Sequence, residues 1–245
     1  MTKNFYWLIQ GDCLEVLPEL EDESIDLVIT SPPYFNISKK YQRGSGIHYS
    51  MDIGEPLYLI IDASKELYPK LKTDGFYCLN LGFSYGETGV LRPFYIVQRL
   101  LRQKWFVIDV IIWHKLNPIP LKNRLTNSFE YIFVLAKHPF QEYPSKPTYR
   151  HNFFEAPVAK SEGFSSAPFP EELPKFCLEV FSREGDVVLD PFLGSGTTMK
   201  VCQDLGRSCI GIEINPEYCE IAKRRCFGRA FLNRDVEYRF EVWNR

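Results

Sequence analysis

The sequence predicts an α/β protein with a doubly wound, mostly parallel sheet of seven strands and one antiparallel hairpin at the edge of that sheet. Short runs of β-branched and aromatic residues alternate with segments of helical periodicity, which is typical of parallel strands joined by helices. Two long apolar runs, Trp105–His114 and Phe129–Ala136, are separated by a Pro-rich stretch and indicate the hairpin. With 245 residues, of which 45% are hydrophobic, the chain can bury the core of one domain covering residues 1–245.

In the N-terminal half, apolar runs bounded by turn residues predict strands, and apolar residues three and four positions apart predict helices. The expected strands are Phe5–Gln10, Ile25–Thr30 and Phe76–Leu81. The expected helices are Leu14–Leu20 (a short helix or turn), Glu55–Leu71 and Pro93–Gln103. Thr73-Asp74-Gly75 is rich in turn formers and should end the helix before it.

The C-terminal half returns to the same alternation after a stretch with little periodicity, residues 138–168, which is rich in Pro, Ser and aromatic residues. A helix should follow the Pro-containing segment Ala167–Leu173. The remaining expected elements are a buried strand over residues 187–190, a helix over Thr198–Leu205, a strand over Cys209–Ile212 and a terminal strand within Phe231–Trp243.

Composition excludes several classes of protein. The net charge of −2 and the pI of about 6.1 do not suit a protein that coats nucleic acid along its whole surface. Apolar runs such as Leu57–Ile61 are far too short to span a bilayer, and the N-terminus lacks the pattern of a signal peptide. Seven cysteines without a Cys-x-x-Cys pair predict reduced, buried thiols in a cytoplasmic protein. The four histidines lack the spacing of metal ligands, so no metal site is expected.

The segment Ser31-Pro32-Pro33-Tyr34 follows directly after the expected strand Ile25–Thr30. Two successive prolines donate no amide hydrogens and stiffen the turn, so the carbonyl of Pro32 stays available as an acceptor. The turn thereby holds a hydroxyl, a carbonyl and an aromatic face close together at the carboxyl end of a strand, where open α/β sheets bind ligands. Such a set suits a planar nucleobase that carries an amino group, although a rigid loop with a packed tyrosine is an equal alternative for this segment alone.

A second segment, residues 187–198, joins a buried strand to a turn with Gly194 and Gly196 and then to the start of a helix. The glycines allow close approach of a ligand to the backbone, and the helix start at Thr197-Thr198 offers free amides. Glu213 follows Gly194 by nineteen residues at the end of the next strand, the usual place of an acidic residue that binds ribose hydroxyls. The loop lacks both the Lys of a Walker A motif and the third Gly of a dinucleotide fingerprint, which favours a nucleoside ligand with little or no phosphate, and Asp190 can hold an ammonium group.

Together the two segments resemble the motifs of the amino-group DNA methyltransferases, which use S-adenosyl-L-methionine. Ser before Pro-Pro-Tyr resembles the cytosine-N(4) branch, whereas adenine enzymes more often carry Asp or Asn at that position. The tetrapeptide precedes the glycine loop by about 160 residues, an order similar to that of the β group. The resemblance extends from Gly11-Asp12 to about Ala222 and implies the Rossmann-like fold of these enzymes with permuted motifs.

The resemblance also implies roles for individual residues. Ser31, Pro32, Pro33 and Tyr34 would form the catalytic loop, Asp12 would bind the adenine amine, Glu213 the ribose, and Asp190 with Thr197 the methionine end. The cofactor-binding residues it implies are Asp12, Cys13, Phe169, Pro170, Asp190, Pro191, Phe192, Gly194, Ser195, Gly196, Thr197, Thr198, Glu213 and Ile214.

The expected substrate is double-stranded DNA, and a restriction system would add a cognate restriction endonuclease as a partner. Basic residues that follow strand ends on the catalytic side predict a local DNA-binding cleft: Lys39, Lys40, Arg43, Lys122 and Arg124. The segments 36–54 and 138–168 are expected to contact DNA and to recognise the target sequence. We expect a monomer or homodimer in the cytoplasm of a prokaryote.

Two alternatives stay open from the sequence. The first is an adenine-N(6) DNA methyltransferase, because Ser31 biases the target base without fixing it. The second is a protein that binds S-adenosyl-L-methionine and DNA as a regulator without catalysis, which the intact Ser-Pro-Pro-Tyr segment disfavours.

Overall fold

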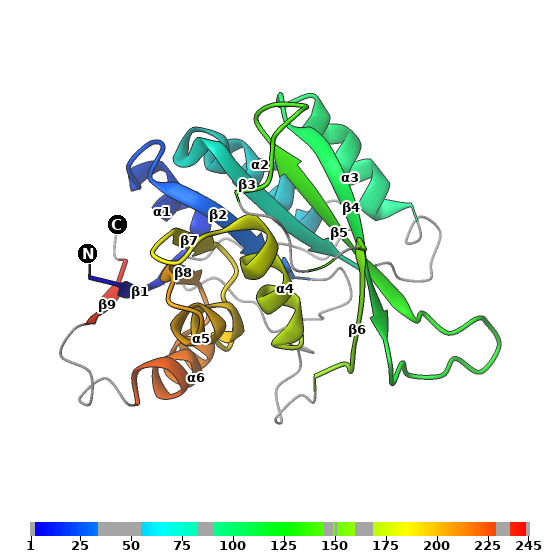
Figure 1. The fold of residues 1–245 in the computed structure, drawn as a ribbon. Helices are drawn as coiled ribbons and strands as arrows, with labels where there is room; N and C mark the ends of the chain where they lie inside the picture. Colours follow the sequence, from blue (N-terminus) through cyan, green and yellow to red (C-terminus); the bar gives the residue numbers. More distant parts are fainter. Residues whose placement is uncertain are drawn as a thin grey trace.

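The computed structural model describes residues 3–33, 55–82, 91–144, 149, 151–159, 169–228 and 236–243. They form a nine-stranded sheet in the order β6-β4-β5-β3-β2-β7-β8-β1-β9, with helices against both faces (Figure 1). The expectation of a doubly wound α/β fold is confirmed, but the expected number of seven strands is wrong.

The strands and helices follow the expected order along the chain. The strands are β1 Phe5–Gln10, β2 Ile25–Thr30, β3 Leu71–Leu81, β4 Phe106–Lys115, β5 Phe129–Ala136, β6 Phe153–Ala156, β7 Val187–Asp190, β8 Ser208–Glu213 and β9 Glu237–Val242. The helices are α1 Cys13–Val16, the 3₁₀ turn η1 Leu17–Glu19, α2 Glu55–Lys70, α3 Arg92–Leu101, α4 Glu172–Phe181, α5 Thr197–Asp204 and α6 Pro216–Phe227.

The expected hairpin exists, but it does not lie at the edge of the sheet. Strand β5 runs antiparallel to both β3 and β4, while the short strand β6 pairs in parallel with the outer side of β4. Strand β6 escapes notice in the sequence because only four residues alternate between exposed and buried positions, with Phe154 and Ala156 pointing inward. This short strand pairs with Ile112–Lys115, the part of β4 whose backbone groups would otherwise be exposed at an edge. At the other end of the sheet, β9 pairs with β1 as the expected terminal strand.

Thr73-Asp74-Gly75 does not end a helix, as the sequence suggested, but lies inside β3. The register jumps there, because Leu71 lies opposite Ile25 and Phe76 lies opposite Leu27 on the neighbouring strand β2. A Cβ atom at Gly75 would come within 2.8 Å of the carbonyl oxygen of Asp26. The turn formers therefore mark a bulge at which two backbones approach closely.

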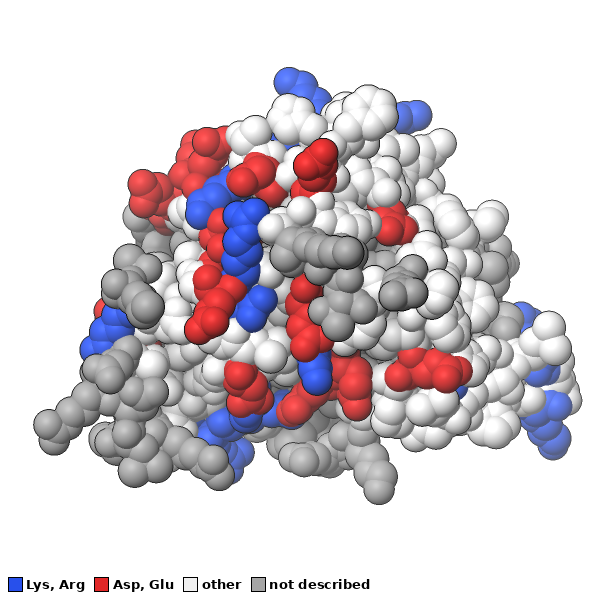
Figure 2. Space-filling view, in the orientation of Figure 1, with Lys and Arg blue, Asp and Glu red and all other residues white. Residues whose placement is uncertain are grey.

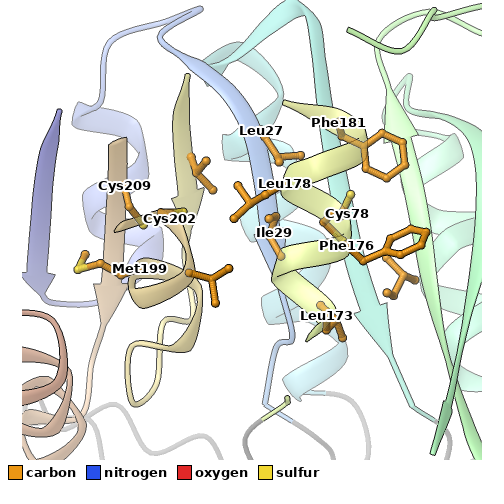
Figure 3. Packing of buried hydrophobic residues seen from close by; sticks show 14 of the residues in the cluster. Leu27, Ile29, Cys78, Leu173, Phe176, Leu178, Phe181, Met199, Cys202 and Cys209 are labelled. Carbon is orange, nitrogen blue, oxygen red and sulfur yellow. The ribbon is translucent and has the colours of Figure 1, made fainter. Parts of the chain in front are cut away.

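Alternating side chains along the strands supply two cores, one on each face of the sheet. Leu27 and Ile29 of β2 face one core together with residues of α4, α5 and α6. Val28 faces the other core, which α1, α2 and α3 cover. Figure 3 shows the first core from close by, with Phe176 and Phe181 of α4 lying over the strands that carry Leu27, Ile29 and Cys78.

Strands β2 and β7 meet at the point where the chain changes direction across the sheet. They are parallel neighbours, with Leu27 opposite Val188 and Val28 opposite Leu189. From β2 the chain continues through α2 to β3 on one side, whereas from β7 it continues through α5 to β8 on the other side. In open α/β sheets the crevice at the carboxyl ends of such a pair is where ligands bind.

Candidate active site

Four neighbouring parallel strands bring the predicted site residues to one edge of the sheet. Strands β2, β7, β8 and β1 lie side by side, and their carboxyl ends carry Ser31, Asp190, Glu213 and Asp12, respectively. The two sequence motifs, which are about 160 positions apart, therefore lie next to each other.

The Asp190 side chain links the two motifs directly. Thr30 Oγ1 donates to Asp190 Oδ1 at 2.8 Å, and Thr198 Oγ1 donates to Asp190 Oδ2 at 2.6 Å. The backbone amide of Phe192 donates to Oδ1 at 3.1 Å. Complete burial raises the pKa of Asp190 to about 6, while these three hydrogen bonds act against that rise. In this arrangement the carboxylate joins β2, β7 and α5, so its expected contact with an ammonium group stays a prediction.

The two glycines of the loop have different surroundings. Both adopt positive φ angles, 57° at Gly194 and 88° at Gly196, a conformation that favours glycine. A Cβ atom at Gly196 would lie 3.1 Å from Ala222 Cβ and from Cys226 Sγ, so this glycine lets the loop pack on α6. No heavy atom among the described residues lies within 4 Å of a Cβ built at Gly194. Gly194 thus borders open space in which a ligand can approach the backbone.

Glu213 closes the loop from the end of β8. Its Oε2 accepts from the Gly194 amide at 2.8 Å, and its Oε1 accepts from the Asn215 amide at 2.7 Å. Burial raises the pKa of Glu213 to about 7; the amides oppose this rise, whereas the charge of Asp190 adds to it. A carboxylate has about four acceptor positions, so Glu213 retains acceptor capacity for a ribose hydroxyl beyond the amides of Gly194, Asn215 and Ile214.

Asp12 lies at the neighbouring strand end, beside Glu213. Its Oδ1 accepts from the Leu14 amide at 3.1 Å and thereby caps α1. The Gly11 amide donates to the carbonyl of Glu213 at 3.0 Å, which fixes the end of β1 against the end of β8. Cys13 is buried in the core, and its contact with the cofactor stays a prediction.

The remaining predicted cofactor residues flank this edge. Phe169 and Pro170 lead into α4, where the carbonyl of Pro170 accepts from the Leu173 amide at 3.1 Å. Three loop residues are half-buried, namely Phe192, Ser195 and Ile214, whereas Pro191 and Thr198 are buried. Their contacts with a cofactor stay predictions.

Arg225 is a site residue that sequence reasoning missed. Its Nη1 donates to Thr197 Oγ1 at 3.0 Å and lies 3.4 Å from Ser195 Oγ, and its Nη2 lies 3.1 Å from Glu171 Oε1. Arg225 therefore ties α6 to the start of α5 and to the beginning of α4. Nothing in the sequence distinguishes it from the adjacent Arg224, because only the packing of α6 on the loop gives it these partners.

The structure describes the predicted catalytic loop as far as Pro33. Ser31 is half-buried and its Oγ accepts from Asn80 Nδ2 at 3.2 Å, while Pro32 is buried. Tyr34 lies outside the described residues, as do Lys39, Lys40, Arg43 and the whole segment 36–54. Their predicted roles stay predictions.

Lys122 and Arg124 are exposed in the connection between β4 and β5. Strand β4 ends, and β5 begins, at the same edge of the sheet as Ser31 and Glu213, because β4 runs parallel to β3 and β5 runs antiparallel to it. Figure 1 shows this connection reaching out from the sheet, and in Figure 2 Lys and Arg side chains appear in that part of the molecule. Elsewhere on the same face, acidic and basic side chains are interspersed.

Neither a metal site nor a membrane-spanning helix is found in the described part of the chain. No three or more His, Cys, Asp or Glu residues among those described are grouped so that they could hold a metal ion. All seven cysteines are free and buried, as expected. None of the described helices is both long and apolar enough to cross a membrane.

A family model described as DNA methylase, and named for N6 and N4 methyltransferases, matches residues 25–224. The chain belongs to this family. The methyltransferase is 32% identical over 266 residues to the type II methyltransferase M.SmaI of Serratia marcescens, with 91% of each chain covered. It is 29% identical to M.Cfr9I of Citrobacter freundii, with 90% of this chain and 87% of the relative covered.

Solved methyltransferase structures share the fold. The PvuII DNA methyltransferase, described as cytosine-N4-specific, has a TM-score of 0.76 and 22% identity, covering 96% of this chain and 98% of that one. A protein of Thermus thermophilus described as a putative DNA modification methylase, in complex with S-adenosyl-L-methionine, has a TM-score of 0.70 and 27% identity, covering 95% and 99%. The methyltransferase therefore uses S-adenosyl-L-methionine and acts on DNA. The open space beside Gly194 and the acceptor capacity of Glu213 fit such a nucleoside cofactor.

Proposed function

We propose that this methyltransferase modifies the exocyclic N4 amine of cytosine in double-stranded DNA. The observation that carries the proposal is the junction of the two motifs, where Thr30, the residue before Ser31, bonds to Asp190 of the glycine-loop strand. This hydrogen bond supports a site in which hydrogen-bond acceptors for the target amine lie directly beside the cofactor loop. Ser in front of Pro-Pro-Tyr favours cytosine over adenine, as does the similarity to the PvuII methyltransferase, which is described as cytosine-N4-specific.

The cofactor supplies an electrophilic methyl group, and the chain must prepare the amine. The lone pair of that amine is delocalised into the base ring, which makes it a poor nucleophile. Ser31 Oγ and the Pro32 carbonyl each accept a hydrogen bond from the amino group of the base. These two bonds draw the nitrogen toward tetrahedral geometry. Holding the amine near the methyl group contributes most of the acceleration. No covalent intermediate is needed, and Tyr34 rather than a nucleophilic Cys adjoins the prolines.

The same proposal assigns the cofactor's parts to the strand ends. Asp12 accepts from the adenine amine, and Glu213 accepts from the ribose hydroxyls. Thr197, whose hydroxyl Arg225 holds at 3.0 Å, lies toward the methionine end. The Asp190 oxygens already accept hydrogen bonds from the hydroxyls of Thr30 and Thr198 and from the Phe192 amide. Asp190 therefore acts at the methionine end by holding Thr198 and the loop in place.

The target amine takes part in base pairing, so the cytosine must leave the duplex before methylation, which costs a few kcal/mol. Stacking on Tyr34 offsets part of this cost. Phosphate contacts come from Lys39, Lys40 and Arg43 in the segment 36–54 and from Lys122 and Arg124 in the β4–β5 connection.

Target recognition is assigned to the segments 36–54 and 138–168. The described contacts support a surface that the β4–β5 connection and the chain after β6 form together, because hydrogen bonds join the two segments. Asn117 Oδ1 accepts from the Val158 amide at 2.6 Å, and the Leu116 amide donates to the carbonyl of Ala156 at 3.1 Å. The β4–β5 connection and the chain after β6 therefore leave the sheet side by side, at the edge that carries Ser31.

We further propose that the enzyme is the modifying partner of a restriction endonuclease, because M.SmaI and M.Cfr9I are type II methyltransferases. Long-read sequencing of DNA from a methylation-free host that expresses the gene tests base and sequence context together. The proposal predicts N4-methylcytosine in one recurring sequence, and Ser31→Ala should strongly reduce the signal. N6-methyladenine would favour the adenine alternative, and unmodified DNA would favour a regulator without catalysis.

A further inference from the structure

Glu130, in strand β5, belongs to neither motif, yet it lies beside the catalytic loop. It is 8% exposed although it carries a carboxylate. Its Oε1 lies 2.7 Å from Lys115 Nζ, in an ion pair whose two side chains are about nine-tenths buried. Its Oε2 accepts from Asn80 Nδ2 at 2.9 Å. A polar chain therefore runs from Lys115 through Glu130 and Asn80 to Ser31.

The chemistry of Glu130 fixes the direction of every hydrogen bond in this chain. An ionised carboxylate only accepts, so the Asn80 side chain must turn its nitrogen, not its oxygen, toward Glu130. The same nitrogen reaches Ser31 Oγ at 3.2 Å. Ser31 Oγ consequently accepts from Asn80, and its hydroxyl hydrogen does not point at Asn80.

We infer that Glu130 is a positioning residue for methyl transfer, which acts on Ser31 through the amide of Asn80. The inference rests on the proposed function, in which Ser31 Oγ accepts an amino hydrogen of the target base. A hydroxyl that is anchored on one side by a donor of fixed orientation presents its oxygen in one place. In a Glu130→Gln variant, the new amide can donate as well as accept. The Asn80 amide can then turn over and offer its oxygen to the Ser31 hydroxyl instead.

The position of this polar chain, Lys115–Glu130–Asn80–Ser31, distinguishes the Lys115–Glu130 contact from a purely structural ion pair. The polar chain crosses from β4 and β5 through β3 to β2 and ends at the catalytic loop. A buried charge pair is costly to desolvate, and apolar residues often replace one without loss of stability. The Lys–Asp contact of β2, between Lys72 and Asp26 at 2.6 Å, lies at the opposite end of that strand, away from Ser31.

The test compares the rate of methyl transfer in a single turnover with the affinity for the cofactor. Glu130→Gln should lower the rate at saturating DNA by about 10- to 100-fold, the scale for a misplaced reacting group. Its dissociation constant for S-adenosyl-L-methionine should stay within about twofold of wild type, because Lys115, Glu130 and Asn80 lie on β4, β5 and β3, whereas the glycine loop follows β7 on the other side of β2. Asn80→Ala, which leaves the Lys115–Glu130 pair intact, should produce the same loss of rate.

Two controls separate positioning from general support of the fold. Asp26→Asn removes the charge from the ion pair at the far end of β2 and should reduce thermal stability while the rate per folded enzyme is kept. In a Ser31→Ala background, Glu130→Gln should cause no further loss of rate, because its effect is transmitted through Ser31. If the fold-losses of rate from Ser31→Ala and Glu130→Gln multiplied in the double variant, the result would contradict the inference.

The failure of this inference can be told from the failure of the proposed function. A wild-type enzyme that methylates DNA, together with a Glu130→Gln variant that does so at the same rate, would overturn the role of Glu130 alone. A folded wild-type enzyme that transfers no methyl group to DNA of mixed sequence would overturn the function and, with it, this role.

Discussion

Thr30 and Asp190 lie 160 positions apart in the chain, and the hydroxyl of Thr30 donates to the carboxylate of Asp190 at 2.8 Å. Neither side chain has measurable exposure to solvent. Thr30 directly precedes Ser31, and Asp190 directly precedes the glycine loop. This hydrogen bond therefore links the Ser31 segment to the glycine-loop strand, in addition to the backbone pairing of β2 with β7.

Thr30→Val should destabilise the folded protein by about 1–3 kcal/mol, the cost of leaving a buried carboxylate without one of its donors. Because Val keeps the shape of Thr, the change removes the hydrogen bond and little packing. Urea denaturation followed by circular dichroism measures the loss. Thr198→Val removes the other hydroxyl partner of Asp190 and should cost a similar amount, and an unchanged stability in both variants would mean that Asp190 gains nothing from these bonds.

Glu213→Ala should weaken binding of S-adenosyl-L-methionine by about 1–3 kcal/mol, because the ribose hydroxyls and the Gly194 amide lose their acceptor. Isothermal titration calorimetry measures the affinity. Glu217→Ala is the matched control, since Glu217 is an exposed carboxylate in the first turn of the next helix. Equal affinities for wild type and Glu213→Ala would remove Glu213 from the cofactor site.

The raised pKa of Glu213, about 7 against an ordinary value of 4.5, predicts a pH dependence of stability. The folded protein holds this proton more tightly than the unfolded chain does. The contribution to stability is therefore fully present below about pH 4.5 and is lost as the pH rises through about 7. The carboxyl of Asp190, with a pKa of about 6, acts in the same direction over a lower range.

Urea denaturation of the cofactor-free protein between about pH 5 and about pH 8 tests this dependence. Glu213→Gln should flatten the decline of the unfolding free energy with rising pH, because the variant has no proton to lose at that position. A decline of equal slope in both proteins would show that Glu213 does not titrate in this range.

Lys122→Ala combined with Arg124→Ala should weaken binding to DNA of every sequence alike. If both side chains contact phosphates, the slope of log affinity against log salt should fall by about 2. Arg102→Ala with Lys104→Ala is the matched control, because both residues are exposed near the start of β4, at the opposite edge of the sheet. Fluorescence anisotropy over a range of salt concentrations measures the slope, and equal slopes for both double variants would refute a role of the β4–β5 connection.

The sequence predicted the elements that carry their own local signal. Asp190 and Glu213 could be placed because each ends a short apolar run, and a glycine loop at fixed spacing lies between them. The bulge in β3 was mistaken for a helix end because Thr73-Asp74-Gly75 is equally suited to a turn. Strand β6 was missed because four residues give too little periodicity to stand out from a Pro-rich segment.

The positioning contacts could not be predicted, because they depend on residues that meet only in the folded sheet. Asn80 and Glu130 are fifty positions apart, and each looks like an ordinary polar residue in an apolar strand. Arg225 reaches Thr197 across twenty-eight positions. Such contacts follow from strand order and helix packing, which the local pattern of the sequence does not encode.

The central claim, methyl transfer to cytosine N4 at the Ser31 loop, is tested most directly by mass spectrometry of nucleosides from DNA treated with the purified enzyme and methyl-deuterated S-adenosyl-L-methionine. We predict deuterated N4-methyldeoxycytidine as the labelled nucleoside, and a strong loss of this product with Ser31→Ala at unchanged cofactor affinity. Deuterium in N6-methyldeoxyadenosine, or in no nucleoside at all, would contradict this claim.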